Sequence, residues 1–231
     1  MDRQLIAAAT MALTLVKPDG FDFRAGQYVE LVLSSFHSRD REGNSRTFSL
    51  ASAPYGRDLQ IAMRMNGTGY KRFLADAPPG TTVELRGPAG EFQLDENGSR
   101  PAVLLAGGIG IAPFLSMIRQ AVHDRSERQI YLFYSNRYPN SVAYLSELKD
   151  LESCHRNLHL VPTITGENCS PGWHGETGHL TPEMLRRYLP GGSRPLFSIC
   201  GPSRFVAGML SLTAAMDAFE ADVQLEDFGE Y

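Results

Sequence analysis

A group of glycines follows a short apolar run in the middle of the chain and could hold a phosphorylated ligand. Gly107, Gly108 and Gly110 come after Val103–Leu105, and Pro113 stands a few residues further on. Glycine lets the backbone turn tightly and approach a ligand closely, and proline fits the first turn of a helix. Because the N-terminus of a helix attracts anions, the stretch predicts a strand, a nucleotide-binding turn and a helix that opens at Pro113. An ordinary strand-to-helix turn is the alternative.

Two further turns in the second half of the chain carry residues suited to a ligand site. They are Ser135–Arg137 and Cys200–Pro202, and each follows an apolar run. In an open parallel sheet, ligands bind beyond the carboxyl ends of the strands. If the runs pair in one sheet, all three turns lie along the same edge, which strengthens the prediction of a nucleotide site there.

The elements that must position these turns alternate in type along the second half. Short apolar runs alternate with helical patterns, which indicates a parallel sheet covered by helices on both faces. The predicted strands are 103–105, 130–134, 158–161, 196–199 and 223–225, and the predicted helices are 114–122, 143–151, 182–188 and 205–216.

The first half follows a different pattern, with short alternating runs separated by turn residues. Such runs without long helical intervals predict a small antiparallel β-barrel. We expect a short helix at Tyr70–Asp76 and an exposed loop at Ser34–Ser45. The linker Glu96–Ser99 divides the chain into a barrel domain (1–98) and an α/β domain (99–231). The predicted strands of the barrel are 13–16, 27–33, 46–50, 58–64 and 82–86.

Composition limits the class of protein. Of the 231 residues, 42% are hydrophobic and 21% are charged, as in ordinary globular proteins. A formal net charge of −4 argues against a nucleic-acid partner, and we find no apolar run of about 18 residues that could span a membrane. Sparse cysteines and a start unlike a secretory signal lead us to expect a cytoplasmic protein. The cysteines and histidines lack the spacing of metal ligands, so no metal is expected.

Four blocks, in order along nearly the whole chain, resemble the ferredoxin–NADP reductase superfamily. Arg46–Ser52 resembles its flavin motif, Gly87–Phe92 the segment that closes the barrel, Ala106–Pro113 its pyridine-nucleotide loop, and Cys200–Pro202 its Cys-Gly-Pro block. Each motif alone is weak, but four in order on fitting elements are specific. The resemblance implies a flavin-binding antiparallel β-barrel of the six-stranded type and an α/β parallel-sheet domain that binds NAD(P)H.

The resemblance implies FAD contacts from both ends of the chain. Arg46 would neutralise the diphosphate, Phe48 would lie against the flavin ring, and Ser49 would bond to flavin N5. The alternatives are a surface arginine, a phenylalanine of the barrel core and an exposed serine. Phe228 or Tyr231 would cover the ring, unless the segment is a frayed tail. The implied FAD contacts are Arg46, Thr47, Phe48, Ser49, Met63, Arg64, Met65, Gly69, Tyr70, Lys71, Phe228 and Tyr231.

The resemblance also implies a nucleotide site and a catalytic group of three residues, Ser49, Cys200 and Glu226. Cys200 would touch the nicotinamide C4 and orient hydride transfer, although a buried structural thiol is the alternative. Because Thr163–Gly166 has no arginine for a 2′-phosphate, we expect NADH to be preferred, with Arg137 as the cation that could hold NADPH. The implied NAD(P) contacts are Gly107, Gly108, Gly110, Pro113, Ser135, Arg137, Thr165, Cys200, Gly201 and Pro202.

These expectations describe a flavoprotein reductase that passes hydride from NAD(P)H to FAD. Electrons would then leave to a separate acceptor, such as a ferredoxin-like protein, an oxygenase component or a small oxidant. The alternative is a non-catalytic reductase-like module that binds a nucleotide or a partner. The sequence leaves the oligomeric state open.

Overall fold

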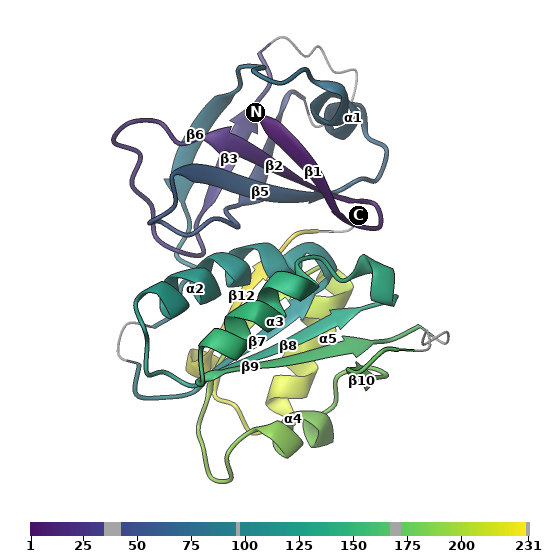
Figure 1. Cartoon of the computed structure of the whole chain (residues 1–231). Coiled ribbons are helices and arrows are strands. Elements are labelled where there is room, and N and C mark those ends of the chain that lie inside the picture. The colour runs from purple at the N-terminus through teal and green to yellow at the C-terminus, as the bar shows by residue number, and fades with distance from the viewer. Residues whose placement is uncertain (35–42, 96–97, 167–171, 230–231) are drawn as a thin grey trace.

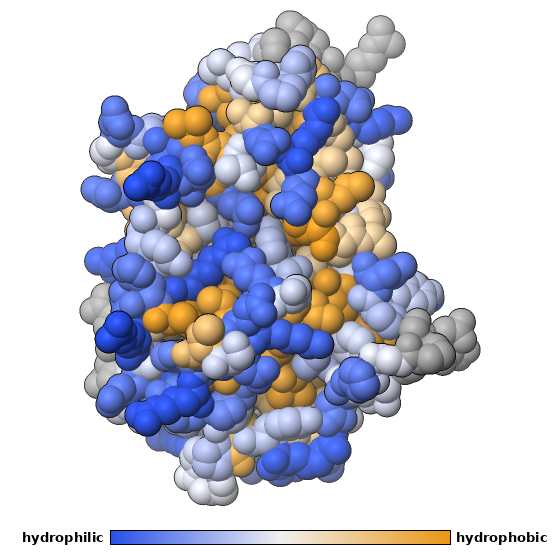
Figure 2. Space-filling model, viewed as in Figure 1, coloured by the Kyte–Doolittle hydropathy of each residue, from blue (hydrophilic) through white to orange (hydrophobic). Residues whose placement is uncertain are grey.

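The computed structural model describes residues 1–34, 43–95, 98–166 and 172–229. An antiparallel β structure forms the first half, and an α/β structure forms the second half below it in Figure 1. Hydrophilic residues predominate on the face shown in Figure 2, and apolar residues occur there in separate groups on both halves. Among the described residues, no helix has the length and apolar character needed to cross a membrane.

Two three-stranded antiparallel sheets build the first half. Their strand orders are β1-β2-β5 and β4-β3-β6, and the isolated bridge between Leu50 and Ile61 joins the two sheets. Inward side chains such as Leu13, Leu31 and Leu59 are fully buried, because alternate residues of a strand face the same side. The elements are β1 (Asp2–Ala7), β2 (Thr10–Val16), β3 (Tyr28–Val32), β4 (Ser45–Ser49), β5 (Asp58–Arg64), α1 (Gly69–Asp76) and β6 (Glu84–Ala89).

A parallel sheet with the order β10-β9-β8-β7-β11-β12 forms the second half. The chain starts this sheet at β7, extends it to one side through β10 and then to the other side through β11 and β12. The switch in direction leaves a crevice at the carboxyl ends of β7 and β11. The elements are β7 (Ala102–Gly107), η1 (Gly108–Gly110), α2 (Ile111–His123), β8 (Ile130–Asn136), η2 (Pro139–Ser141), α3 (Leu145–Cys154), β9 (Leu158–Ile164), β10 (Glu176–Thr177), α4 (Pro182–Tyr188), β11 (Leu196–Gly201), α5 (Ser203–Ala214), η3 (Glu220–Asp222) and β12 (Val223–Asp227).

Helices cover both faces of the parallel sheet. On β7, Leu104 and Ala106 pack into the cluster that contains α2 and α3, whereas Val103 and Leu105 pack into the cluster that contains α4 and α5. A strand buried on both faces has apolar residues at every position, as β7 does. Helix α2 lies between this sheet and the barrel, as Figure 1 shows, and Ala51 of the barrel belongs to the same buried cluster as α2.

The predicted fold class is confirmed, with differences at several boundaries. The barrel strands form two linked sheets, and the edge strands β1 and β10 were not predicted. Helix α2 begins at Ile111, two residues before Pro113, because the turn Gly108–Gly110 already has helical character. Most of the predicted loop 34–45 and part of the linker lie outside the described residues, so the division at residue 98 remains a proposal.

Candidate functional site

A cleft of about 580 Å³ lies between the barrel and the carboxyl edge of the parallel sheet. The barrel contributes residues of β3, β4, β5 and the start of α1, and the α/β half contributes residues of η1, α2 and the end of β12. The lining residues are Tyr28, Glu30, Ser45, Arg46, Thr47, Phe48, Ser49, Ala62, Met63, Arg64, Asn66, Thr68, Lys71, Ile109, Ala112, Glu226, Asp227 and Phe228. Nine of these belong to the predicted catalytic and FAD-binding sets.

The centre of the cleft joins two predicted catalytic residues from opposite ends of the chain. The Ser49 hydroxyl donates a hydrogen bond of 2.7 Å to Glu226 Oε1. Glu226 Oε2 is buried and has no hydrogen-bond partner in the described part of the chain. Burial raises the pKa of Glu226 above its ordinary value, and the bond from Ser49 partly opposes this shift. Glu226 can therefore hold a proton at a higher pH than an exposed glutamate can.

Cys200, the third predicted catalytic residue, lies directly beside Glu226. Strands β11 and β12 run parallel, with Cys200 and Glu226 as partners in the register. The cysteine side chain is fully buried, and its pKa is raised well above the ordinary value, first by burial and then by the charges of Glu226 and Asp227. Because a thiolate is the reactive form of cysteine, this buried thiol is not suited to nucleophilic attack, and its burial matches the structural role given above as the alternative.

Cationic and polar groups line the end of the cleft next to α1. The Arg46 guanidinium lies 4.9 Å from the centre of the Tyr70 ring, and its Nη1 donates to the Ser45 carbonyl at 2.7 Å. Lys71 is 6% exposed, so it does not point into solvent. Thr68 caps α1, with its hydroxyl accepting from the Lys71 N–H at 3.4 Å. A helix N-terminus beside two cations suits a phosphorylated group.

Some residues of the predicted FAD set lie away from the cleft lining. The Tyr70 ring is fully buried in the barrel core, and its hydroxyl donates to the Leu31 carbonyl at 2.7 Å. Met65 packs against the same core, and Gly69 does not line the cleft. Only the backbone atoms of Gly69 and Tyr70, at the start of α1, are therefore left to contact FAD. Tyr231 lies outside the described residues, whereas Phe228 lines the cleft and donates its N–H to the Gly201 carbonyl at 3.1 Å.

Three of the four glycines predicted to bind a nucleotide, Gly107, Gly110 and Gly201, are required by close packing at the ends of β7 and β11. A Cβ on Gly110 would lie 2.2 Å from the Cys200 carbonyl oxygen, and a Cβ on Gly107 would lie 2.6 Å from the Phe205 ring. Gly108 has a φ of +54° and faces open space, so its backbone is accessible to a ligand. Gly201 also packs under Phe205, and Pro202 caps α5. Pro113 is buried in the first turn of α2 and presents no group to a ligand.

The remaining predicted nucleotide residues lie further along the same sheet edge. Ser135 on β8 is the register partner of Gly107 on β7. Thr165, just after β9, donates its N–H to the Asn136 carbonyl at 2.9 Å. Arg137 is exposed, and its guanidinium lies 5.4 Å from the centre of the Tyr138 ring. All three turns predicted from the sequence therefore meet at one edge.

Sequence reasoning missed several residues of the site. Thr68 was recognisable as a threonine two residues before the predicted helix. Tyr28 follows from strand pairing because it is the register partner of Ser49. Ile109 and Ala112, which line the cleft from the α/β half, stand inside the glycine block. Phe205, which covers Gly107 and Gly201, gave no signal in the spacing.

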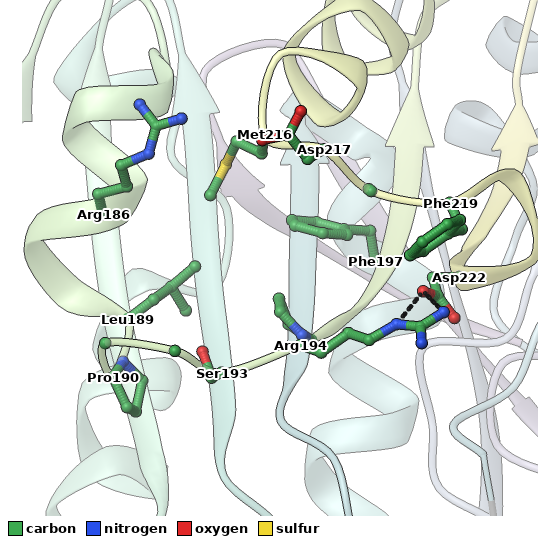
Figure 3. Close-up of a pocket in the computed structure, with 14 residues that line it drawn as sticks. Arg186, Leu189, Pro190, Ser193, Arg194, Phe197, Met216, Asp217, Phe219 and Asp222 are labelled. Atoms are coloured by element: carbon green, nitrogen blue, oxygen red, sulfur yellow. Dashed lines mark hydrogen bonds and ion pairs between the residues drawn. The ribbon is translucent and has the colours of Figure 1, made fainter.

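A second hollow, of about 520 Å³, lies at the opposite, amino-terminal edge of the sheet. Residues before β11 and β12 and after α4 and α5 form it, and no predicted site residue lines it. Figure 3 shows Arg194 directed at Asp222, with Phe219 beside it. Arg194 Nε donates to Asp222 Oδ2 at 2.9 Å, Arg100 Nη1 donates to Oδ1 at 2.8 Å, and the Arg194 guanidinium lies 4.3 Å from the centre of the Phe219 ring. The charges at this edge pair with one another.

Comparisons with known proteins agree with the motifs. The family model of the oxidoreductase NAD-binding domain matches residues 104–210. Ferredoxin–NADP reductase B of Sorangium cellulosum is 30% identical over 205 residues, which are 84% of this chain and 81% of that protein. The reductase component of propane 2-monooxygenase from Rhodococcus jostii is 29% identical over 214 residues, which are 89% of this chain and 55% of that protein.

The fold has close counterparts among solved structures. A ferredoxin NADP⁺ reductase from Neisseria gonorrhoeae with bound FAD and NADP aligns with a TM-score of 0.80 at 23% identity, covering 97% of this chain and 95% of that one. The chain spans about half the length of most of the curated relatives that it matches. With the four motifs, the cleft and the Sorangium relative taken together, the chain belongs to the ferredoxin–NADP reductase superfamily.

Proposed function

We propose that the protein is an FAD-dependent NAD(P)H oxidoreductase, in which hydride passes from the nicotinamide to the flavin and electrons then pass to an external acceptor. The observation that carries the proposal is the hydrogen bond between Ser49 and Glu226 in a cleft that both halves line. A cleft with a proton-holding carboxyl group at its centre and cations next to α1 suits the flavin ring and the diphosphate of FAD.

The residues of the cleft fit FAD in character. Phe228 offers apolar surface to a flat ring system, whereas Phe48 and Met63 line the cleft with side chains that pack mainly in the barrel core. Arg46 and Lys71 stand near the N-terminus of α1 for a diphosphate. The chemistry that FAD supplies when bound is to accept a hydride and to release electrons one at a time.

The nucleotide would bind at the turns along the carboxyl edge of the sheet. The accessible backbone of Gly108 and the N-terminus of α2 would hold its diphosphate, and no acidic residue in the first turn of α2 opposes this. Cys200 would touch the reacting end of the nicotinamide and orient it. Phe228 lies between this edge and the cleft, where its ring would cover the flavin until a nucleotide displaces it.

Within the cleft, Ser49 and Glu226 are the groups that can hold or move a proton. The raised pKa keeps a proton on Glu226 over a wider pH range. Because the Ser49 hydroxyl donates to Oε1, that proton would sit on Oε2, which has no partner among the described residues. Because Cys200 is buried and keeps its proton, it adds no charge next to Glu226. The protein thereby supplies position and a proton, and excludes water from the buried side of the cleft.

The acceptor is proposed to be a ferredoxin-like protein or an oxygenase component. The supporting observations are the names of two relatives, a ferredoxin–NADP reductase and a monooxygenase reductase component. Single-electron release to iron centres is the chemistry that such partners share.

The decisive experiment is anaerobic reduction of the purified, FAD-loaded protein. We expect a yellow protein whose flavin absorbance bleaches within seconds of adding NADH or NADPH, and whose colour returns with ferricyanide as a one-electron acceptor. A protein that binds neither FAD nor FMN on reconstitution, yet still binds a nucleotide, would instead be the non-catalytic module considered above.

A further inference from the structure

Helix α2 presents one face to the barrel over most of its length. Ala112, Ser116, Arg119 and His123 are spaced by four, three and four residues, so they share one side of the helix. Ala112 lines the cleft, the Ser116 hydroxyl donates to the Ser52 carbonyl at 2.6 Å, and the His123 ring stacks on Tyr55 with centroids 4.0 Å apart at 15°. The barrel contacts of Ser116 and His123 fall in the segment that links β4 to β5.

Arg119 makes the most extensive of these contacts. Its Nε and Nη2 donate to the two carboxylate oxygens of Glu147 on α3, at 2.6 and 2.9 Å. Its Nη1 donates across the boundary to the Ala51 carbonyl at 2.8 Å and to Gln60 Oε1 at 3.1 Å. The side chain is 17% exposed. The planar guanidinium therefore fixes α2 and α3 on one side and the barrel on the other.

The Arg119 contact joins two segments that are each next to one of the proposed cofactor sites. Ala51 is two residues beyond Ser49, at the centre of the cleft, and its N–H donates to the Gln60 carbonyl at 2.7 Å. Helix α2 begins directly after Gly108–Gly110, where the nucleotide diphosphate is proposed to bind. A shift of α2 relative to Ala51 would therefore change the distance between the proposed hydride donor and acceptor.

We infer that Arg119 is a positioning residue for hydride transfer, which sets the separation of the nicotinamide from the flavin without touching either. The inference rests on the proposed function. A misplacement of about 1 Å between reacting groups can slow a reaction a hundredfold, so the loss of one bond across the boundary has a measurable effect. Arg46 and Gly108, which would bind the cofactors, lie outside the contact, so binding is affected less than rate.

The test uses the full-length, FAD-loaded protein with Arg119→Lys and Arg119→Ala. A lysine keeps a charge for Glu147, but a single ammonium group cannot hold both carboxylate oxygens and reach Ala51. Stopped-flow reduction at saturating NADH gives the rate, titrations give the dissociation constants of FAD and nucleotide, and the long-wavelength charge-transfer absorbance of the complex reports the contact of the two rings. Arg194→Ala is the matched control, because it removes an arginine–carboxylate pair at the opposite edge of the sheet.

We expect both Arg119 variants to be reduced about tenfold more slowly, to lose charge-transfer absorbance and to keep both dissociation constants within about twofold. Arg194→Ala should retain the wild-type rate even if its melting temperature falls. If Arg119→Ala does not fold, the rate and absorbance of Arg119→Lys alone test the inference. A wild-type rate in the Arg119 variants, or a slow rate explained by weaker binding, overturns the inference. If the wild-type protein itself is not reduced by NADH or NADPH, the proposed function fails first.

Discussion

Two carboxylates at opposite ends of β12 show what separates a site from a structural contact. Asp222, directly before the strand, receives hydrogen bonds from Arg100 and Arg194, which lower its pKa. Glu226, within the strand, receives one bond from Ser49 and has one oxygen without a partner among the described residues, and burial raises its pKa. The hollows beside them are similar in volume, about 520 and 580 Å³. The unsatisfied oxygen of Glu226, and not volume, distinguishes the cleft from the second hollow.

The largest effect is expected from Glu226→Gln, which removes the proton-holding group and keeps its shape. Turnover with a one-electron acceptor should fall about a hundredfold, a usual contribution of a positioned acid. In the wild-type protein, turnover should decline as the pH rises through the raised pKa of Glu226, because the carboxyl group then loses its proton. The variant should lack this decline. A wild-type pH profile in Glu226→Gln would show that the proton comes from another group.

Arg46→Ala should mainly weaken FAD binding. A charge-assisted hydrogen bond contributes about 1.5–3 kcal/mol, so the dissociation constant should rise about ten- to a hundredfold. Titration of the apoprotein with FAD measures it. Arg187→Ala is the matched control, because Arg187 lies on α4, outside the cleft lining, and pairs with Glu176 at the surface. Equal FAD affinity in the two variants would remove Arg46 from the site.

Cys200→Ala should slow flavin reduction about tenfold while nucleotide affinity changes little, because the buried thiol orients the nicotinamide and does not anchor it. Single-turnover reduction over a range of NADH concentrations separates the two quantities. Cys154→Ala serves as the control, since Cys154 is an exposed free cysteine at the end of α3. If both variants are reduced at the wild-type rate, Cys200 has a structural role only.

The sequence predicted elements well where local chemistry decides them. Strand β5 and helix α4 match the predicted bounds 58–64 and 182–188, since alternation marks the first and Pro182 after the capping Thr181 marks the second. Strand β1 escaped detection because most of its residues are exposed at an edge of the sheet. Local patterns carry no information on which distant strands become neighbours.

Prediction of the site required knowing which residues far apart in the sequence become neighbours, and only the family resemblance supplied that information. Ser49 and Glu226 are 177 positions apart in the chain, and nothing in their local sequence pairs them. The resemblance placed Tyr70 among the cofactor contacts, whereas the structure buries its side chain in the barrel core, where its hydroxyl satisfies the Leu31 carbonyl. A motif therefore indicates which segment of the chain lies at the site, and packing decides which of its side chains reach the cleft.

NADH should be preferred over NADPH by a modest factor. The stretch Thr163–Gly166 supplies no cation, and its end packs against the backbone of Arg137, since the Gly166 N–H donates to the Arg137 carbonyl at 2.9 Å. Steady-state kinetics with both nucleotides measures the ratio of kcat/KM. Arg137→Ala should leave the NADH value unchanged and lower any residual NADPH activity, because guanidinium suits a phosphate. A higher kcat/KM for NADPH that Arg137→Ala abolishes would reverse the assignment.

The smallest effect on activity, and the sharpest test of the comparison, is expected from Asp222→Asn. An amide cannot pair with Arg100 and Arg194 as the carboxylate does, so the melting temperature at neutral pH should fall. The lowered pKa of Asp222 means that its stabilising contribution is present above the pKa of the unfolded chain and is lost as the pH falls through the folded value. The stability of the variant should therefore depend less on pH in the acidic range.

FAD affinity and the rate of reduction, measured below the melting transition, should equal those of the wild-type protein, because the pair lies at the edge of the sheet remote from the cleft. Slower reduction in Asp222→Asn would contradict the division between the two ends of β12, since it would tie a structural ion pair to the chemistry at Glu226.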